Sequence, residues 1–319
     1  MTSIRIATTG DALARARADS VSATLASGSG VSVEIVPTTG DPRACLVAGE
    51  CDLVVSAIAA LPVATVLTIP AAGSEASTAS VITKEEGMLK RGFNSDLLYP
   101  RFSILNPELA FSLPKDQAAN GIADIMSHLL ERYFTNSRPV ELTDRLIEAT
   151  LRTVIDAAPR VMADPRDYDA WAEIMWSGTI AHNNLLNTGR VGDWATHDLE
   201  HEVSAAYGVA HGAGLAMLFP AWMRYTIKHD IPRFAQLASR VWGADASFFD
   251  QERTAREGIA RLEAFWTSLG LAVRLSGRGI GAERIGEMAD KASSGGTRTV
   301  GNFVKIGKAE AEAIYRLAL

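Results

Sequence analysis

Histidines at helical spacing are the residues of this chain best suited to chemistry. The segment WATHDLEHEVSAAYGVAHGAGLAMLFP holds three of the six histidines in the sequence, His197, His201 and His211. His197 and His201 are four residues apart, so they project from one face of a helix, for which Thr196 is the expected N-cap. Gly208 should end that helix, and His211 can then return to the same point from a second helix.

An aspartate and a histidine far upstream repeat this spacing. Asp124 and His128 lie four residues apart in GIADIMSHLLERYF, whose apolar residues recur at helical intervals. Buried polar groups need partners, so an aspartate and several imidazoles on apolar helix faces indicate a metal site. Neutral imidazoles with one carboxylate suit Fe²⁺ or Zn²⁺ better than Mg²⁺ or Ca²⁺. We expect His182 and His229, which stand alone, to be structural.

The same residues permit a second metal chemistry. His197, Glu200 and His201 fit H-x-x-E-H, the inverted zinc-peptidase pattern, in which both histidines bind zinc and the glutamate is the general base. A five-residue pattern arises easily by chance, and this interpretation leaves the upstream pair and His211 unexplained. A metal-binding or scaffold protein without catalysis is the third class that the residues allow.

Composition and charge exclude several other function classes. The 319 residues are 47% hydrophobic and 21% charged, with a formal net charge of -6. A nucleic-acid-binding protein needs a basic face, which this sequence does not offer. No apolar run reaches the roughly 18 residues of a membrane-spanning helix, and the N-terminus does not resemble a signal sequence, so we expect a cytoplasmic protein. Cys45 and Cys51 are too few for a disulfide framework.

The first third of the chain alternates strands and helices. We expect strands at Ile4 to Thr8, Val31 to Val36 and Asp52 to Ile58, separated by helices at Asp11 to Leu25 and Pro42 to Gly49. This alternation predicts a mostly parallel α/β sheet. The GSG within Ser27 to Gly30 follows a helix and precedes a strand, so we interpret it as a turn rather than a phosphate loop.

A better candidate for a nucleotide loop follows the next strand. The apolar run Val63 to Ile69 leads into PAAGSEAS, Pro70 to Ser77, whose small and hydroxyl side chains let a phosphate or ribose approach the backbone. We expect Lys84 to Arg91 to form a solvated hairpin and Phe102 to Leu105 to form a further strand.

Helical periodicity dominates after Pro107. We expect an α/β domain over residues 1–107 and an all-α metal-binding domain over residues 108–319, with the metal site facing a cleft between them. The predicted helices are Asp116 to Thr135, Val140 to Ala158, Tyr168 to Leu186, Thr196 to Tyr207, Gly212 to Tyr225, Ile231 to Trp242, Gln251 to Leu269 and Gly281 to Ser293.

Four motifs of this chain resemble those of the iron-containing alcohol dehydrogenase family. They are VLTIPAAGSEAS, LPKDQAANGIADIMSH, GDWATHDLEHE and AHGAGLAMLFPAW. The resemblance runs from about residue 62 to residue 319 and is closest to the butanol dehydrogenase and NADPH-dependent aldehyde reductase branch. It implies an α/β dinucleotide-binding domain followed by a helical metal domain, the dehydroquinate synthase-like architecture. It also implies hydride transfer between NAD(P)H and a small alcohol or aldehyde, and we expect a homodimer.

By this resemblance each candidate residue has a role. The implied ligands of a divalent metal, Fe²⁺ or Zn²⁺, are Asp124, His128, His197 and His211. His201 is implied to be the catalytic residue, near substrate and nicotinamide. The residues implied to line the cleft for NADP or NAD are Thr68, Gly73, Ser74 and Lys90.

The first 62 residues depart from that family. They lack the glycine-rich GGGSxxD loop whose amides hold the cofactor pyrophosphate in family members, so we expect weakened NAD(P)H binding and impaired activity. IRIATTGDALARARAD, VEIVPTTGD and ACLVAGECDLVVSAIAALP resemble shortened pieces of the first lobe of hydroxymethylbilane synthase, the porphobilinogen deaminase of tetrapyrrole synthesis. Thr9, Ala59 and Ala60 replace an arginine, a lysine and the catalytic aspartate of that family, which makes a deaminase-like enzyme the least favoured alternative. The sequence therefore predicts a composite chain.

Overall fold

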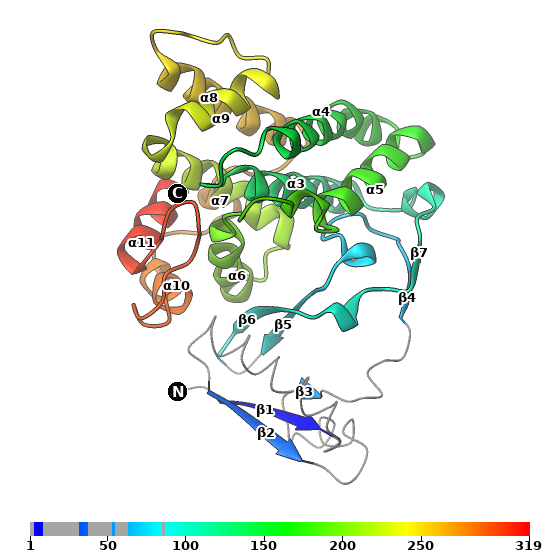
Figure 1. The fold of residues 1–319 in the computed structure, drawn as a ribbon, viewed down its shortest axis with the longest axis vertical. Coiled ribbons are helices and arrows are strands. Elements are labelled where there is room, and N and C mark those ends of the chain that lie inside the picture. The colour runs from blue at the N-terminus through cyan, green and yellow to red at the C-terminus, as the bar shows by residue number, and fades with distance from the viewer. Residues whose placement is uncertain (1–2, 9–31, 38–52, 55–62, 85–86) are drawn as a thin grey trace. The chain divides into compact units, whose positions relative to one another are not determined.

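The chain divides into two compact units, each described here by itself (Figure 1). The computed structural model describes residues 3–8, 32–37, 53–54, 63–84 and 87–319. The smaller unit consists of Met1–Ala64, Thr78–Ile82 and Arg91–Phe102, and the larger of Thr65–Ser77, Thr83–Lys90 and Ser103–Leu319. All six histidines belong to the larger unit, so the candidate chemistry is a property of that unit.

A three-stranded parallel sheet forms the described core of the smaller unit. Its strand order is β2 (Ser32–Pro37), β1 (Ser3–Thr8) and β3 (Leu53–Val54), with β1 parallel to both neighbours. The register pairs Ile6 with Ile35 and Leu53. The first two predicted strands and the parallel pairing are confirmed. The predicted helices at residues 11–25 and 42–49, and the turn at residues 27–30, lie outside the described residues.

Two short strand pairs follow. β4 (Ala64–Val66) pairs with β7 (Phe102–Ile104), and β5 (Ala79–Lys84) pairs with β6 (Leu89–Asn94). The predicted hairpin and the strand at residues 102–105 are therefore confirmed. The strand predicted over residues 63–69 is only three residues long. Val63 and Val66 are 48% and 57% exposed, whereas Leu67 is buried in the core.

Helices make up most of the larger unit. They are α3 (Lys115–Tyr133), α4 (Glu141–Ala163), α5 (Tyr168–His182), α6 (Ala195–Tyr207), α7 (His211–Thr226), α8 (Ile231–Arg240), α9 (Gln251–Ser268), α10 (Ile285–Ala292) and α11 (Lys308–Leu317). No described helix is both long and apolar enough to cross a membrane.

Helix α3 is the centre of this unit. It packs against α4, α5 and α7, and every residue from 118 to 133 is buried. A helix that is covered on all sides normally carries few polar residues. α3 nevertheless buries Asp124, His128, Glu131 and Arg132, so these four side chains must find partners inside the core.

Several helices differ from the prediction. α5 ends at His182 rather than Leu186, and α10 begins at Ile285 rather than Gly281. α4 continues past Pro159 to Ala163, although proline removes one backbone donor, because the extra turn buries Val161 in the core. α11 was not predicted. Its apolar residues Ala311, Ile314 and Tyr315 are all buried, and their helical spacing was a signal in the sequence that could have found it.

A buried ionic network joins α4 to α8 and to the loop before α6. Arg190 Nη2 and Arg233 Nη2 donate to Asp144 Oδ1 at 2.7 and 2.6 Å. Gln236 Nε2 donates to Asp144 Oδ2 at 3.1 Å, and the carboxylate is 3% exposed. Burial raises the pKa of Asp144, but the hydrogen bonds and charges of Arg233 and Arg190 outweigh it and bring the net pKa below its usual value.

Asp144→Asn should destabilise the fold by about 3 to 5 kcal/mol at pH 7, because two arginines lose their buried counter-charge. The folded-state pKa of Asp144 is lowered, so its stabilisation is fully present above about pH 4 and is lost as the pH falls further. Urea unfolding of both proteins should therefore converge below about pH 4.

The control is Glu141→Gln. The Glu141 side chain is 51% exposed and pairs with Arg145 and Arg240 at the surface, which should be worth about 0 to 1 kcal/mol. An Asp144→Asn protein as stable as this control at pH 7 would contradict the structural role of the network.

Candidate metal centre

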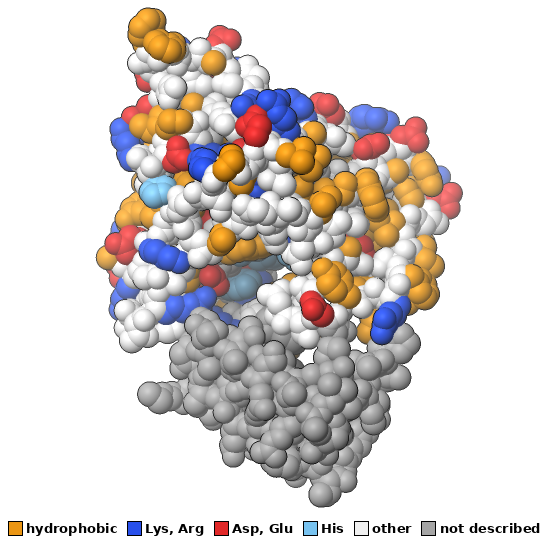
Figure 2. All heavy atoms as spheres, in the orientation of Figure 1, with side chains coloured by type: hydrophobic (Ala, Val, Ile, Leu, Met, Phe, Trp, Pro, Cys, Tyr) orange, Lys and Arg blue, Asp and Glu red, His pale blue; other side chains and the backbone are white. Residues whose placement is uncertain are grey.

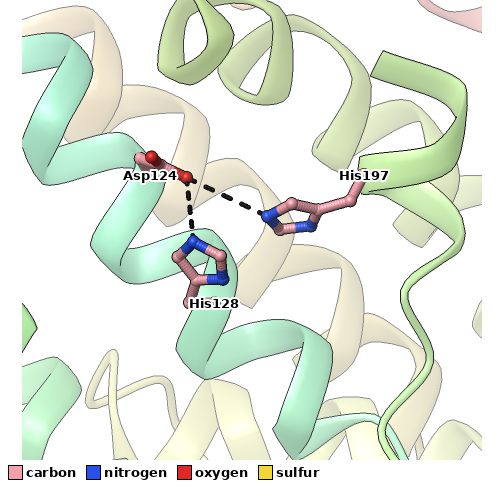
Figure 3. Close-up of side chains that lie close together, drawn as sticks. All are labelled: Asp124, His128 and His197. Atoms are coloured by element: carbon pink, nitrogen blue, oxygen red, sulfur yellow. Dashed lines mark ion pairs between the residues drawn. The ribbon is translucent and has the colours of Figure 1, made fainter. Parts of the chain in front are cut away.

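Three histidines, one from each of α3, α6 and α7, surround one carboxylate oxygen of Asp124 on α3. Asp124 Oδ1 lies 3.3 Å from His128 Nε2, 3.9 Å from His197 Nε2 and 3.9 Å from His211 Nε2. Figure 3 shows the first three of these residues, with the Asp124 oxygen between two imidazole nitrogens. Two ligands of one Zn²⁺ or Fe²⁺ ion, each about 2.0 to 2.2 Å from it, lie 3 to 4 Å apart. The spacing therefore fits a single ion.

The same side chains carry polar atoms that have no hydrogen-bond partner. Asp124 Oδ1, both ring nitrogens of His128 and His197 Nε2 are buried and unpartnered. Asp124, His128 and His197 are 3%, 4% and 7% exposed, and Figure 2 shows histidine atoms set back from the surrounding surface. An unpaired buried polar group costs about 1 to 3 kcal/mol. A cation bound by Asp124 Oδ1, His128 Nε2 and His197 Nε2 would remove that cost for these three atoms, and three imidazoles with one carboxylate suit Fe²⁺ or Zn²⁺.

The protonation of these groups also suits a metal site. Burial lowers the pKa of His128 and His197 well below the usual value, so both imidazoles are neutral and each keeps a lone pair. Burial raises the pKa of Asp124 to about 6, which shows how strongly this carboxylate needs a positive charge beside it.

Glu131 holds His197 and the start of α6 together. His197 Nδ1 lies 2.9 Å from Glu131 Oε1, and the backbone N–H groups of Trp194 and His197 donate to the same carboxylate at 2.7 and 3.1 Å. Thr196 Oγ1 donates to it as well. The N-cap predicted at Thr196 is wrong, because Trp194, with a left-handed φ of 69°, occupies that position. A carboxylate on Nδ1 directs the Nε2 lone pair of His197 toward Asp124.

Glu131 was not among the residues predicted from the sequence, although a signal was present. It lies three residues after His128 and seven after Asp124, on the same stripe of α3. A wholly buried glutamate on that stripe is unusual, because glutamate is almost never fully buried unless it is paired.

His182 lies closer to the site than expected for a histidine predicted to be structural. Its ring centroid is 4.1 Å from that of His128. His182 Nδ1 accepts a hydrogen bond from Arg132 Nη2 at 3.0 Å. Burial, and then the charge of Arg132, lower the pKa of His182 to about 3. His182 is therefore neutral and packs against a candidate ligand.

His201 and Glu200 belong to a second group of side chains. Their ligand atoms cluster with those of His211, whereas His197 groups with Asp124 and His128. The peptidase pattern requires His197 and His201 to share one ion with Glu200 as a free base. Glu200 Oε2 instead accepts from His211 Nδ1, which leaves no support for that reading of the motif.

The candidate cofactor residues lie on two segments of the larger unit. Gly73 adopts a left-handed φ of 65°, and a Cβ there would overlap the His182 side chain. Lys90 Nζ lies 3.5 Å from Glu200 Oε2 and 3.5 Å from His211 Nδ1. The structure thus brings Gly73 and Lys90 to the histidine groups, while Thr68 and Ser74 present exposed side chains on the same loop as Gly73.

The close approach of α7 to α3 at Gly212 can be tested by adding a methyl group there. A Cβ on Gly212 would overlap the backbone carbonyl of Asn120, so Gly212 lets His211 come within reach of Asp124. Gly212→Ala should cost about 1 to 3 kcal/mol of stability by overpacking and should also weaken metal binding. Thermal unfolding and metal content give the two readouts.

The matched control is Gly286→Ala in α10, where a Cβ meets nothing within 4 Å. Alanine stabilises an open helical position by about 0.5 to 1 kcal/mol. Equal stability and equal metal content in the two variants would show that the α3–α7 approach does not position His211.

The chain matches two sequence profiles of one family. The profile for iron-containing alcohol dehydrogenase matches residues 6–107, and that for the C-terminal part of the Fe-containing alcohol dehydrogenase family matches residues 118–319. The first match includes most of the segment that we compared with hydroxymethylbilane synthase. That second resemblance finds no support in the comparisons, and neither does the composite chain inferred from it.

Curated relatives agree with the profiles. The chain is 44% identical over 260 residues to the probable NADH-dependent butanol dehydrogenase 1 of Bacillus subtilis (strain 168), covering 82% of this chain and 67% of that protein. It is 34% identical over 261 residues to the NADPH-dependent aldehyde reductase YqhD of Escherichia coli (strain K12), covering 81% and 66%. The matched part thus spans about two thirds of the length of these relatives.

Solved structures show the same relationship. The crystal structure of E. coli K-12 YqhD matches with a TM-score of 0.79 at 29% identity, covering all of this chain and 77% of that chain. An NADH-dependent butanol dehydrogenase A from Thermotoga maritima matches with a TM-score of 0.78 at 29% identity, covering 100% and 91%. Family members combine an α/β domain with an α-helical domain, and the larger unit of this chain is likewise rich in helices. The chain belongs to the iron-containing alcohol dehydrogenase family, a family of oxidoreductases.

Proposed function

We propose that this chain is a metal-dependent alcohol dehydrogenase or aldehyde reductase that transfers a hydride between NAD(P)H and a small alcohol or aldehyde. The observation that carries the proposal is the convergence of unpartnered ligand atoms from Asp124, His128 and His197 with His211 Nε2. The names of the relatives support the reaction class, since they include butanol dehydrogenases and an aldehyde reductase.

Asp124, His128, His197 and His211 would hold the ion. When bound, a divalent ion supplies Lewis acidity toward a carbonyl or alkoxide oxygen. Glu131 keeps the His197 lone pair directed at the site. Asp124, His128 and His197 are buried, and the low dielectric around them strengthens their electrostatic interactions.

His201 is the residue that we propose to act near substrate and nicotinamide. Its ring centroid lies 5.6 Å from that of His211. Burial, followed by the charge of His211, holds the pKa of His201 well below its usual value. His201 is thus a neutral imidazole beside the metal group, able to accept or donate a hydrogen bond.

Thr68, Gly73, Ser74 and Lys90 are the proposed contacts of the dinucleotide. Close packing anchors this loop to the metal-binding helices, because a Cβ on Gly121 of α3 would overlap the carbonyl oxygen of Pro70. Curated relatives are named for NADH or for NADPH, so either nucleotide is compatible with the family. The division near residue 107, the homodimer and the cytoplasmic location stay predictions.

Removal of one ligand should separate metal binding from turnover. His197→Ala should lose most of the bound divalent metal, since three ligands hold an ion far less tightly than four. His201→Ala should keep the metal and lose aldehyde reduction. Elemental analysis of the purified proteins, with NAD(P)H consumption on a short aldehyde, gives both readouts. Full metal occupancy in His197→Ala would remove His197 from the ligand set.

The cofactor prediction concerns affinity. Without the glycine-rich loop, two charge-assisted hydrogen bonds to the pyrophosphate would be missing, each worth about 1.5 to 3 kcal/mol. NADH and NADPH should then bind at least about a hundredfold more weakly than to a relative that has the loop. A fluorescence titration of both nucleotides measures this. Equal affinity in the two proteins would mean that other backbone amides replace the loop.

A further inference from the structure

We infer that Glu200 is a positioning residue, which fixes the tautomer and the direction of the His211 imidazole at the metal centre. The inference rests on the proposed function, because it assumes that His211 Nε2 is a metal ligand. In this role Glu200 is neither a general base, as the H-x-x-E-H pattern would have it, nor a metal ligand.

Glu200 sits in a site built to hold one carboxylate. Its side chain is fully buried, and Oε2 accepts from His211 Nδ1 while Oε1 accepts from Ser204 Oγ. Lys90 Nζ lies 3.5 Å from Oε2. Gly214 leaves the space for this carboxylate, because a Cβ at that position would overlap Glu200 Oε1. The carboxylate cannot shift toward α7 without meeting that helix.

The hydrogen-bond roles determine the tautomer of His211. A carboxylate only accepts, so the proton between His211 and Glu200 belongs to Nδ1, and Lys90, which only donates, then donates to Glu200 Oε2 rather than to that nitrogen. In the neutral ring Nε2 then carries the lone pair. That atom is the one 3.9 Å from Asp124 Oδ1. Glu200 therefore does for His211 what Glu131 does for His197.

The ammonium of Lys90 disfavours binding of a second metal ion beside Glu200. Glu200, His201 and His211 are close enough together to hold a cation. The Lys90 ammonium already lies 3.5 Å from both Glu200 Oε2 and His211 Nδ1. A divalent ion there would have to displace the ammonium and break the Glu200–His211 hydrogen bond. One ion per chain is the expected stoichiometry.

A double-mutant cycle tests the inference with Zn²⁺ affinity, measured by competition with a chromophoric chelator. Glu200→Gln should weaken Zn²⁺ binding by about ten- to hundredfold, the usual effect of removing a carboxylate from a ligating histidine. In a His211→Ala background the same change should have less than about a twofold effect, because Glu200 acts only through that imidazole. The visible absorption of bound Co²⁺ should change in Glu200→Gln, since the geometry of one ligand changes.

Glu202→Gln is the matched control. Glu202 is also buried, 2% exposed, and lies on the same helix, but it belongs to neither group of candidate metal ligands among the described residues. Its Zn²⁺ affinity and Co²⁺ spectrum should match the unmodified chain. Equal losses in Glu202→Gln and Glu200→Gln would overturn the inference, because any buried charge on α6 would then have the same effect.

Gly214→Ala tests position without changing the chemistry of Glu200. The added methyl group displaces the carboxylate and should weaken Zn²⁺ binding in the same direction as Glu200→Gln, while alanine favours the helix. Thermal unfolding confirms that each variant is folded. A folded Gly214→Ala chain with unchanged affinity would overturn the inference.

The outcomes separate this inference from the proposed function. If the unmodified chain and His211→Ala bind Zn²⁺ equally weakly, the proposed metal site itself is wrong. If His211→Ala loses affinity and Glu200→Gln does not, only the role of Glu200 is wrong. Additive losses in the double variant, or a second Zn²⁺ that Glu200→Gln removes, would make Glu200 a ligand and overturn the inference.

Discussion

Polar atoms without partners inside an apolar helical core are the constraint on which this structure depends. Asp124 and His128 lie on the most deeply buried helix of the larger unit, and His197 meets them from a second helix. The surrounding side chains are largely hydrocarbon and cannot supply the missing hydrogen bonds. The desolvation cost is offset when a cation binds all of these atoms together. The burial that penalises the unpaired polar atoms also keeps the imidazoles of His128 and His197 neutral, as metal ligands must be.

Backbone contacts set the separation of the ligands. Gly121 and Gly212 lie where α3 meets Pro70 and where α7 meets Asn120, and neither position has room for a Cβ. Helix α3 is therefore in backbone contact with α7 and with the loop at Pro70, about one turn before Asp124. Close packing transmits small shifts rather than absorbing them, so a glycine distant from the chemistry controls whether His211 reaches the ion. Glu131 and Glu200 then fix the rotation of the His197 and His211 imidazoles, which helix packing leaves free.

The sequence predicted the parts of the site that depend on local geometry. Asp124 with His128 could be recognised because four residues make about one helical turn, whatever the helix packs against. Glu131 lies on the same stripe of α3, but its role could not be predicted, because it arises when the start of α6 meets α3, a contact between residues far apart in the chain. The N-cap at Thr196 was wrong for the same reason, since a carboxylate from another helix satisfies the N–H groups that a local cap would serve. Helix α11, by contrast, could have been predicted, because the helical spacing of its apolar residues was present in the sequence.

The H-x-x-E-H pattern shows why spacing alone does not decide chemistry. The pattern places Glu200 and two histidines within about one turn of a helix, which suits a peptidase as well as it suits this fold. What separates the two is a lysine more than a hundred residues upstream and a histidine on the next helix. Lys90 supplies a cation where a second ion could otherwise bind, and His211 gives Glu200 a proton to accept. Because the Glu200 carboxylate is held by His211, Ser204 and Lys90, it is placed to orient a ligand rather than to serve as the free base that the peptidase pattern requires.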